Sequence, residues 1–214
     1  MSTLDLGVLI SGRGSNLLSI LHAIGADRLD ARVRLVVSNR PDAGGLVHAK
    51  ARDVPTRVLS HKDHPSREAY DAALVTALRE AGVTFVVLAG FMRIVTPVLL
   101  DAFPGRVVNI HPSLLPAFPG VHSQAQALAY GVKITGCTVH YVDAGCDTGP
   151  VIAQTAVPVL DADTEETLSA RILTAEHGLL PRVLQWIAQD RVTMLPAAPG
   201  ARPRVLVHDD TSED

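Results

Sequence analysis

Asn109 and His111 stand two residues apart in the stretch VVNIHPSLLP, at the end of an apolar run. Residues two apart on a β-strand share a face, so both side chains can reach one spot. An amide N–H and an imidazolium N–H are both hydrogen-bond donors, and together they can stabilise a developing oxyanion. The alternative interpretation is structural, because Asn and His at a strand end also satisfy loop backbone groups.

Asp147 lies in the glycine-flanked stretch VDAGCDTGP. An acidic residue in such a stretch is usually a turn former. If it instead meets His111 across the site, its carboxylate favours the charged imidazolium and raises the pKa of the imidazole. In that case the sequence predicts that His111 is a competent acid near neutral pH.

A third candidate is SGRGSN, which runs from Ser11 to Asn16 between a strand-like and a helix-like segment. Gly12 and Gly14 allow a tight turn, and the start of the following helix offers unpaired N–H groups that suit a phosphate. The stretch lacks the third glycine of the dinucleotide fingerprint, and it is not a P-loop. An ordinary strand–helix turn with Ser15 as the helix cap is the alternative.

Other polar groups are weaker candidates. Cys137, His140 and Cys146 do not have a zinc-site spacing, and residues 137 and 140 face opposite sides of a strand. For HKDHP, residues 61–65, a solvated loop is favoured over a metal site. We therefore predict no metal. Glu176 is either solvated or reaches into the cleft, and the pattern is neutral between the two.

The composition limits the classes of function. The chain has 214 residues, 47% of them hydrophobic, which is enough to bury a core without disulfides. A net charge of −3 provides no basic footprint for a nucleic acid. The N-terminus has no signal-peptide pattern, and no apolar run is long enough to span a membrane. We expect a soluble, cytoplasmic protein.

The candidate residues need a scaffold that gathers strand ends, and the first half of the chain predicts one. Strand-like and helix-like segments alternate, which is typical of a parallel sheet with helices on both faces. Such sheets bind ligands at the carboxyl ends of their strands. The expected strands are Leu6–Ile10, Val33–Ser38, Thr56–Leu59, Thr84–Ala89 and Arg106–Ile110. The expected helices are Asn16–Gly25, Leu46–Arg52, Ser66–Ala81 and a short one near Pro97–Phe103.

The pattern changes after His111. A Pro-rich loop leads to a short helix, His122–Tyr130, and then to two strand-like runs, Cys137–Val142 and Val151–Val159. The connection between these runs has no room for a helical crossover, so we expect them to pair antiparallel at the edge of the sheet.

A long amphipathic helix is expected to follow and to end near Gln189, with a capping-box-like start at Asp163 and Glu166 and a kink at Pro181. We expect one α/β domain, residues 1–194, with an open, doubly wound, mostly parallel sheet and antiparallel strands added in the C-terminal third. Residues 195–214 are expected to form a partly disordered tail with at most one short strand.

Several stretches together resemble the folate-dependent phosphoribosylglycinamide formyltransferase family. They are VLISGRGSNL, VVSNR, SREAYD, VVLAGFMRI, VNIHPSLLPAFPG, GCTVHYVDAGCDTGPVI and TAEHGLLP. The resemblance extends in register to about Met194. Folate-dependent formyl-transferring enzymes in general share NIHPSLLP followed by an Asp in a Gly-rich loop, whereas GRGSN and LAGFMRI are similar to this family in particular.

The resemblance implies a formyltransferase fold and a complete set of site residues. The implied catalytic residues are Asn109, His111 and Asp147. The implied contacts of phosphoribosylglycinamide are Gly14, Ser15 and Asn16, which bind its phosphate, and Glu176. The implied folate contacts are Arg67, Met92, Arg93, Ile94, Val95, Asn109, Ala144, Gly145, Cys146 and Thr148. One departure is Ala117, where some members of the family carry Lys, and this could weaken an electrostatic contribution.

The implied reaction is direct transfer of the formyl group of 10-formyltetrahydrofolate to the glycyl amine. The folate is then a co-substrate, no cofactor is tightly bound, and the partners are small molecules rather than nucleic acid or membrane. The protein is expected to be a monomer or a homodimer. The rivals are methionyl-tRNA formyltransferase and formyltetrahydrofolate deformylase, which normally carry a further domain, and a non-enzymatic nucleotide-binding module.

Overall fold

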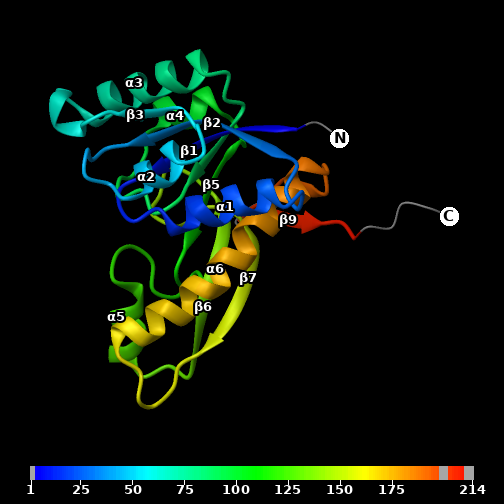
Figure 1. Ribbon diagram of the computed structural model, residues 1–214. Helices are drawn as coiled ribbons and strands as arrows, with labels where there is room; N and C mark the ends of the chain where they lie inside the picture. Colours follow the sequence, from blue (N-terminus) through cyan, green and yellow to red (C-terminus); the bar gives the residue numbers. More distant parts are fainter. Residues whose placement is uncertain (1–2, 198–201, 210–214) are drawn as a thin grey trace.

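The computed structural model describes residues 3–197 and 202–209, and its framework is one large sheet (Figure 1). The strands of this sheet are β1 (Leu4–Ile10), β2 (Ala31–Ser38), β3 (Thr56–Val58), β4 (Phe85–Leu88), β5 (Val107–His111), β6 (Ile134–Tyr141) and β7 (Val151–Pro158). Their order is β3-β2-β1-β4-β5-β6-β7. Strands β1 to β5 run parallel, and β6 and β7 extend the sheet antiparallel. The predicted fold class and the antiparallel pairing are therefore confirmed.

Helices cover both faces of the sheet, as Figure 1 shows. They are α1 (Ser15–Gly25), α2 (Gly45–Lys50), α3 (Arg67–Glu80), α4 (Pro97–Ala102), α5 (Ser123–Tyr130) and α6 (Glu165–Ala188), with a 3₁₀ turn, η1 (His61–Asp63). Helices α1, α2 and α6 pack into one hydrophobic core, and α3 and α4 pack into a second. Because both faces are covered, parallel strands are apolar on both sides. Adjacent residues Val8 and Leu9 of β1, for example, belong to different cores.

The structure corrects the details of two elements. Strand β6 begins at Ile134, three residues before the predicted start at Cys137. The capping box of α6 is formed by Thr164 and Thr167 rather than by Asp163 and Glu166. The Asp163 carboxylate instead forms an ion pair with Arg171, at 2.6 Å between Oδ2 and Nη1. A charge-assisted hydrogen bond to a guanidinium stabilises a carboxylate more than a hydrogen bond from a helix N–H does. Asp163 therefore pairs with Arg171 and does not cap the helix.

The C-terminal region contains a second, small sheet. Strand β8 (Val192–Leu195) pairs antiparallel with β9 (Arg204–Val207). A domain boundary at residue 194 would therefore cut through β8, and part of the predicted tail is a strand. Residues 198–201 and 210–214 of that predicted tail lie outside the described residues. Helix α6 continues through Pro181, where a kink was expected.

The turn between β1 and α1 requires glycine at residue 14. Gly14 has a φ of 74°, in the left-handed region, and it precedes α1 as its N-cap. A Cβ built there would lie 2.3 Å from the Cα of Gly45, at the start of α2. Gly12 has no such constraint, because a Cβ at that position meets nothing within 4 Å. The close approach of two backbones thus fixes the turn against α2.

Replacement of Gly14 by Ala is expected to destabilise the fold by more than about 1 kcal/mol, because a left-handed backbone and a steric clash are both imposed. Gly12→Ala, two residues away, is the matched control and should change stability by less than about 0.5 kcal/mol. Urea unfolding of the two variants measures the difference. Equal stabilities would contradict the close approach of Gly14 to Gly45.

Candidate active site

Strand β5 presents Asn109 and His111 on one face, near its carboxyl end. The imidazole of His111 is buried, and its Nε2 lies 2.9 Å from the carbonyl oxygen of Phe118, which follows in the Pro-rich loop. A carbonyl oxygen only accepts hydrogen bonds, so Nε2 carries a proton and donates it. The other nitrogen, Nδ1, faces Asp147 at 3.3 Å from Oδ2. The structure thus brings the three predicted catalytic residues together.

The Asp147 carboxylate is the centre of this cluster. Its Oδ2 accepts a hydrogen bond from the Gly120 backbone N–H at 2.8 Å. Its Oδ1 accepts one from the Asn109 amide at 3.4 Å and lies 3.6 Å from Nε2 of His140. Asp147 has a φ of 55°, a left-handed conformation that turns its side chain back from the β6–β7 loop toward β5. Two strands and two loops therefore meet at one carboxylate.

The charge states of this pair differ from the sequence-based expectation. Burial raises the pKa of the Asp147 carboxyl, but His140, the Gly120 N–H and the charge of His111 outweigh burial and hold that pKa at about 2. Burial lowers the pKa of His111, although the Phe118 carbonyl and Asp147 both raise it. Asp147 thus acts in the predicted direction, but the expected net increase is wrong. Desolvation of the ring outweighs the carboxylate, so the net pKa of His111 lies below that of a free histidine.

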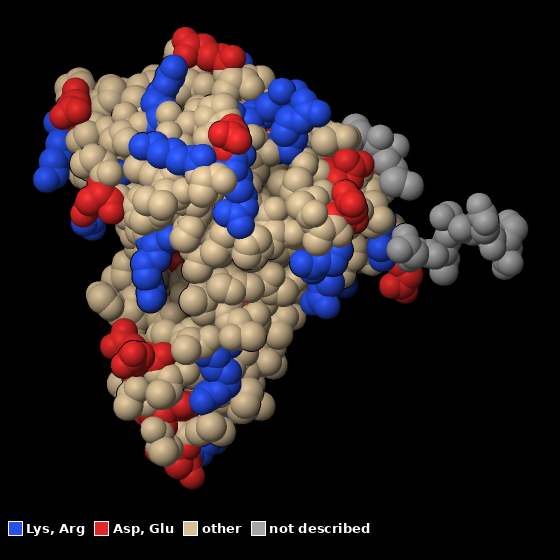
Figure 2. Space-filling model, viewed as in Figure 1, with Lys and Arg blue, Asp and Glu red and all other residues tan. Residues whose placement is uncertain are grey.

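The Gly-rich turn lies at the start of α1. Gly14 rather than Ser15 is the N-cap, and no side chain in the described part of the chain caps the helix. Its first N–H groups therefore lack a side-chain partner and point out of a positive helix end, which suits an anion. In the space-filling view, the surface is notched between the body that carries this turn and the lower part that carries α5 (Figure 2).

Asn16 and Glu176 join this turn to α6. The Asn16 amide donates a hydrogen bond of 2.7 Å to Oε2 of Glu176, and both side chains are buried. Oδ1 of Asn16 is buried and has no hydrogen-bond partner among the described residues. Burial raises the pKa of Glu176 to about 7, against the hydrogen bond from Asn16 that lowers it. A buried amide oxygen without a partner beside a carboxyl that titrates near neutral pH is typical of a ligand site.

The predicted folate residues fall into two segments. In the first, Arg67 at the start of α3 donates a hydrogen bond to the Ile94 carbonyl at 3.0 Å, and the Met92 N–H donates to Ser11 Oγ at 2.9 Å. The side chains of Met92 and Ile94 are exposed. The Val95 side chain is buried in the core with α3 and α4, which leaves only its backbone for a ligand.

The second segment is the loop that carries Asp147. Asp143 Oδ1 accepts hydrogen bonds from the Gly145 N–H at 3.0 Å and from Thr148 Oγ1 at 2.7 Å. These bonds hold the turn in which Ala144, Gly145 and Cys146 are exposed. Among the described residues, the Arg93 side chain has no hydrogen-bond or ion-pair partner. The Ala117 N–H donates to the Leu114 carbonyl at 3.0 Å, and the Ala117 carbonyl accepts a hydrogen bond from Ser113 Oγ at 2.5 Å.

Sequence reasoning missed His140 as a site residue, because it weighed this residue only as a metal ligand. The register of β5 and β6 places His140 directly opposite Asn109. The strand pattern predicted that β6 and β7 pair with each other, but it did not predict the register of β6 against β5. Within the described part of the chain, no three His, Cys, Asp or Glu side chains are grouped as a metal site would require. His61 and His64 pack edge-on against Tyr70.

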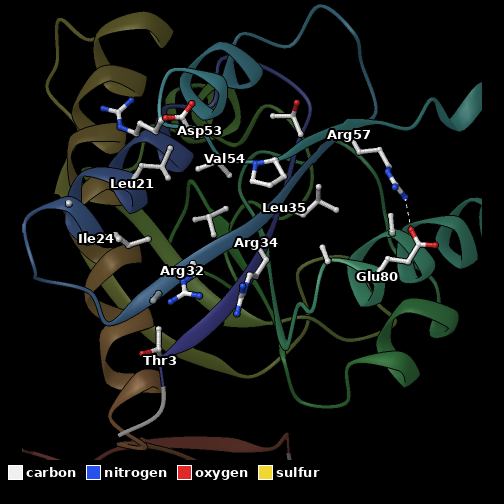
Figure 3. Close-up of a pocket in the computed structure, with 18 residues that line it drawn as sticks. Thr3, Leu21, Ile24, Arg32, Arg34, Leu35, Asp53, Val54, Arg57 and Glu80 are labelled. Atoms are coloured by element: carbon white, nitrogen blue, oxygen red, sulfur yellow. Dashed lines mark hydrogen bonds and ion pairs between the residues drawn. The ribbon is translucent and has the colours of Figure 1, made fainter.

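A further hollow lies away from these residues. A groove of about 1040 Å³ runs along β2 between α1 and α3, and its walls include Arg32, Arg34 and the ion pair Arg57–Glu80 (Figure 3). None of the predicted site residues lines this groove. Among the described residues, no helix is both long and apolar enough to cross a membrane.

Comparisons with known proteins agree on the family. The sequence pattern of the formyl transferase family matches residues 5–184. Phosphoribosylglycinamide formyltransferase of Escherichia coli is 44% identical over 191 residues, which cover 89% of this chain and 90% of that protein. The Mycobacterium tuberculosis enzyme of the same name is 50% identical over 188 residues, which cover 88% of this chain and 86% of that protein.

A longer relative and a solved structure complete the comparison. The trifunctional purine biosynthetic protein adenosine-3 of Drosophila pseudoobscura pseudoobscura is 52% identical over 85% of this chain, and the match spans only 13% of that protein. The crystal structure of glycinamide ribonucleotide transformylase 1 from Symbiobacterium toebii superposes with a TM-score of 0.92 at 48% identity and covers 97% of this chain and 95% of that one. The chain belongs to the formyl transferase family.

Proposed function

We propose that this protein transfers the formyl group of 10-formyltetrahydrofolate to the glycyl amine of 5'-phosphoribosylglycinamide in purine biosynthesis. The observation that carries the proposal is the cluster in which Asp147 contacts both His111 and Asn109. The relatives from E. coli and M. tuberculosis, which match over most of their length, support this choice of substrate.

The phosphorylated substrate is proposed to bind along α1. Its phosphate would meet the N–H groups at Gly14, Ser15 and Asn16, where a left-handed glycine opens the helix. Glu176 would accept hydrogen bonds from the rest of the substrate, and the unpartnered Oδ1 of Asn16 would gain a donor. The folate would lie against Arg67, Met92–Val95, Asn109 and the loop Ala144–Thr148.

The proposed reaction is a direct attack of the substrate amine on the formyl carbon, which gives a tetrahedral intermediate. The Asn109 amide would donate a hydrogen bond to its oxyanion, and the positive charge of protonated His111 would stabilise the same oxyanion. The C–N10 bond then breaks, and the formyl group remains on the amine. The proton lost by the amine passes to N10 of the departing folate, with the Asp147 carboxylate ordering the water that relays it.

The lowered pKa of His111 shapes this mechanism. The ring must be charged to stabilise the oxyanion, and burial disfavours the charged ring in the free protein. A negative charge that develops on the formyl oxygen would offset the desolvation and favour the imidazolium. His111 would therefore be charged chiefly as the oxyanion forms, which is where a charge assists most.

The proposal needs no tightly bound cofactor, because the carbon arrives on a folate co-substrate. Its partners would be small molecules rather than nucleic acid or membrane. The net charge of −3 supports the exclusion of nucleic acid, because it provides no basic surface for a phosphate backbone. On the face shown in Figure 2, basic and acidic side chains are interspersed. A monomer or homodimer acting in the cytoplasm completes the proposal, with one domain that extends past residue 194 to include all of β8.

The direct test is a mass balance of the purified protein with both substrates. One formylated phosphoribosylglycinamide should form for each tetrahydrofolate released. Release of formate and tetrahydrofolate in equal amounts, without a formylated amine, would identify a folate hydrolase and reject the proposal.

Asp147→Asn removes the charge and nearly preserves the shape of the side chain. Because the carboxylate raises the pKa of His111, its loss should lower that pKa further. Formyl transfer should fall by roughly a hundredfold or more, and the residual rate should move toward lower pH. Titration of the His111 ring by NMR should show a pKa below the ordinary histidine value in the wild-type protein and lower still in the variant. An unchanged His111 pKa would contradict the pairing.

Glu176→Gln tests the buried carboxyl. With a pKa of about 7, Glu176 is protonated below neutral pH and is then a poorer acceptor. The KM for phosphoribosylglycinamide should therefore rise as the pH falls through this value in the wild-type protein. The variant should lose this pH dependence, whereas Glu166→Gln, at an exposed position in the first turn of the same helix, should retain it. A pH dependence that persists in Glu176→Gln would exclude Glu176 from the substrate site.

A further inference from the structure

His140 is a buried residue for which the proposed mechanism has no role. It lies on β6 directly across the antiparallel ladder from Asn109. Its side chain is 2% exposed, so water is not available to satisfy either ring nitrogen. Nδ1 lies beside the Tyr141 carbonyl, and Nε2 lies beside the Asn109 amide and, farther away, the Asp147 carboxylate. These neighbours determine where the ring proton lies.

The Nδ1 end of the ring is fixed by the backbone. Nδ1 lies 2.8 Å from the carbonyl oxygen of Tyr141. A carbonyl oxygen has no proton to give, so Nδ1 must carry the hydrogen and donate it. In a neutral ring, Nε2 is then a bare lone pair that can only accept.

The Nε2 end meets the amide nitrogen of Asn109 at 3.1 Å. The orientation of that amide is set independently by Asp147, whose Oδ1 accepts from Nδ2 of Asn109 at 3.4 Å. If the amide were reversed, its oxygen would face the Asp147 carboxylate, which is repulsive. The NH₂ group of Asn109 therefore points toward two acceptors, Asp147 and Nε2 of His140.

A competing arrangement would place a proton on Nε2 of His140 and pair it with Asp147. The distance from Nε2 to Oδ1 of Asp147 is 3.6 Å, which is too long for a hydrogen bond. A proton on Nε2 would also point at the NH₂ group of Asn109, donor against donor. Asp147 does not depend on such a bond, because the Gly120 N–H and the Asn109 amide already satisfy its oxygens.

We propose that His140, as the neutral tautomer with its proton on Nδ1, accepts a hydrogen bond from Asn109 and so positions the amide that stabilises the oxyanion. His140 holds one N–H of Asn109. The second N–H makes only the longer contact with Asp147 and is the one free to turn to the formyl oxygen. His140 is thus a positioning residue that acts through Asn109, and this catalytic role rests on the proposed function, whereas the tautomer does not.

The tautomer can be measured directly on the full-length protein without substrate. Nitrogen-15 NMR of the His140 ring at neutral pH should show a protonated Nδ1 and an unprotonated Nε2. In Asn109→Ala, the Nε2 resonance should shift because its donor is lost. A proton on Nε2, in either the neutral or the charged ring, would overturn the inference even if formyl transfer is fully established.

Two substitutions separate the acceptor from the bulk of the ring. His140→Gln retains an acceptor oxygen near the position of Nε2, and His140→Leu removes it. The kcat of the Leu variant should fall by about tenfold to a hundredfold, which is no more than the loss caused by removing an oxyanion donor itself. The KM for phosphoribosylglycinamide should not change. The Gln variant should recover most of that loss. Equal losses in the two variants would mean that packing, not hydrogen bonding, is the role of the residue.

Combination with Asn109→Ala provides the last control. In the Asn109→Ala background, His140→Leu should lower kcat little further, because the two residues act as one unit. An undiminished loss would show that His140 does not act through Asn109. Thermal unfolding of all variants identifies any that fail to fold, and for those the NMR measurement on the wild-type protein still decides. Absence of formyl transfer in the wild-type protein would reject the proposed function alone.

Discussion

The Asp147 carboxylate is the interaction on which the arrangement of the site depends. Its two oxygens face a backbone N–H of the Pro-rich loop, the imidazole of His111 and the amide of Asn109. Burial raises the pKa of this carboxyl, but His140, the Gly120 N–H and the charge of His111 outweigh burial and hold that pKa at about 2, so the group is an acceptor at every physiological pH. An acceptor of fixed charge dictates the orientation of its neighbours, whereas a group that titrates near neutral pH would not. The orientation of the side chains in the site thus follows from a single ionised carboxylate that is partly shielded from water.

The fold brings this carboxylate to its partners through topology. The carboxyl ends of β1, β4 and β5 meet at one edge of the sheet, which gathers the Gly-rich turn, the segment before α4 and the residues of β5. The antiparallel pair β6 and β7 then returns the chain across β5, and the left-handed conformation of Asp147 turns its side chain inward. Packing of α1 against α6 adds the contact between Asn16 and Glu176. Two hydrophobic cores, one on each face, hold these elements in place.

Much of this arrangement could be predicted from the sequence, because periodicity and turn residues are local signals. The strands of the parallel half and the antiparallel extension are of this kind. The placing of His111 and Asp147 in one site followed from the family resemblance rather than from local signals. The sequence could not predict the register that sets His140 opposite Asn109, because register depends on the packing of whole strands. Nor could it predict the net pKa of His111, because desolvation depends on burial in three dimensions. The capping box at Thr164 was missed because Asp163 has a stronger partner in Arg171.

The central claim is that Asp147 and His111 act as one unit in the proposed transfer, and a double-mutant cycle on kcat/KM tests it most directly. The cycle compares Asp147→Asn, His111→Ala and the double variant with the wild-type protein. The account predicts that the double variant loses far less activity than the product of the two single losses, because each substitution already disables the pair. Losses that multiply fully would show that the two residues contribute independently, and the pairing would have to be abandoned.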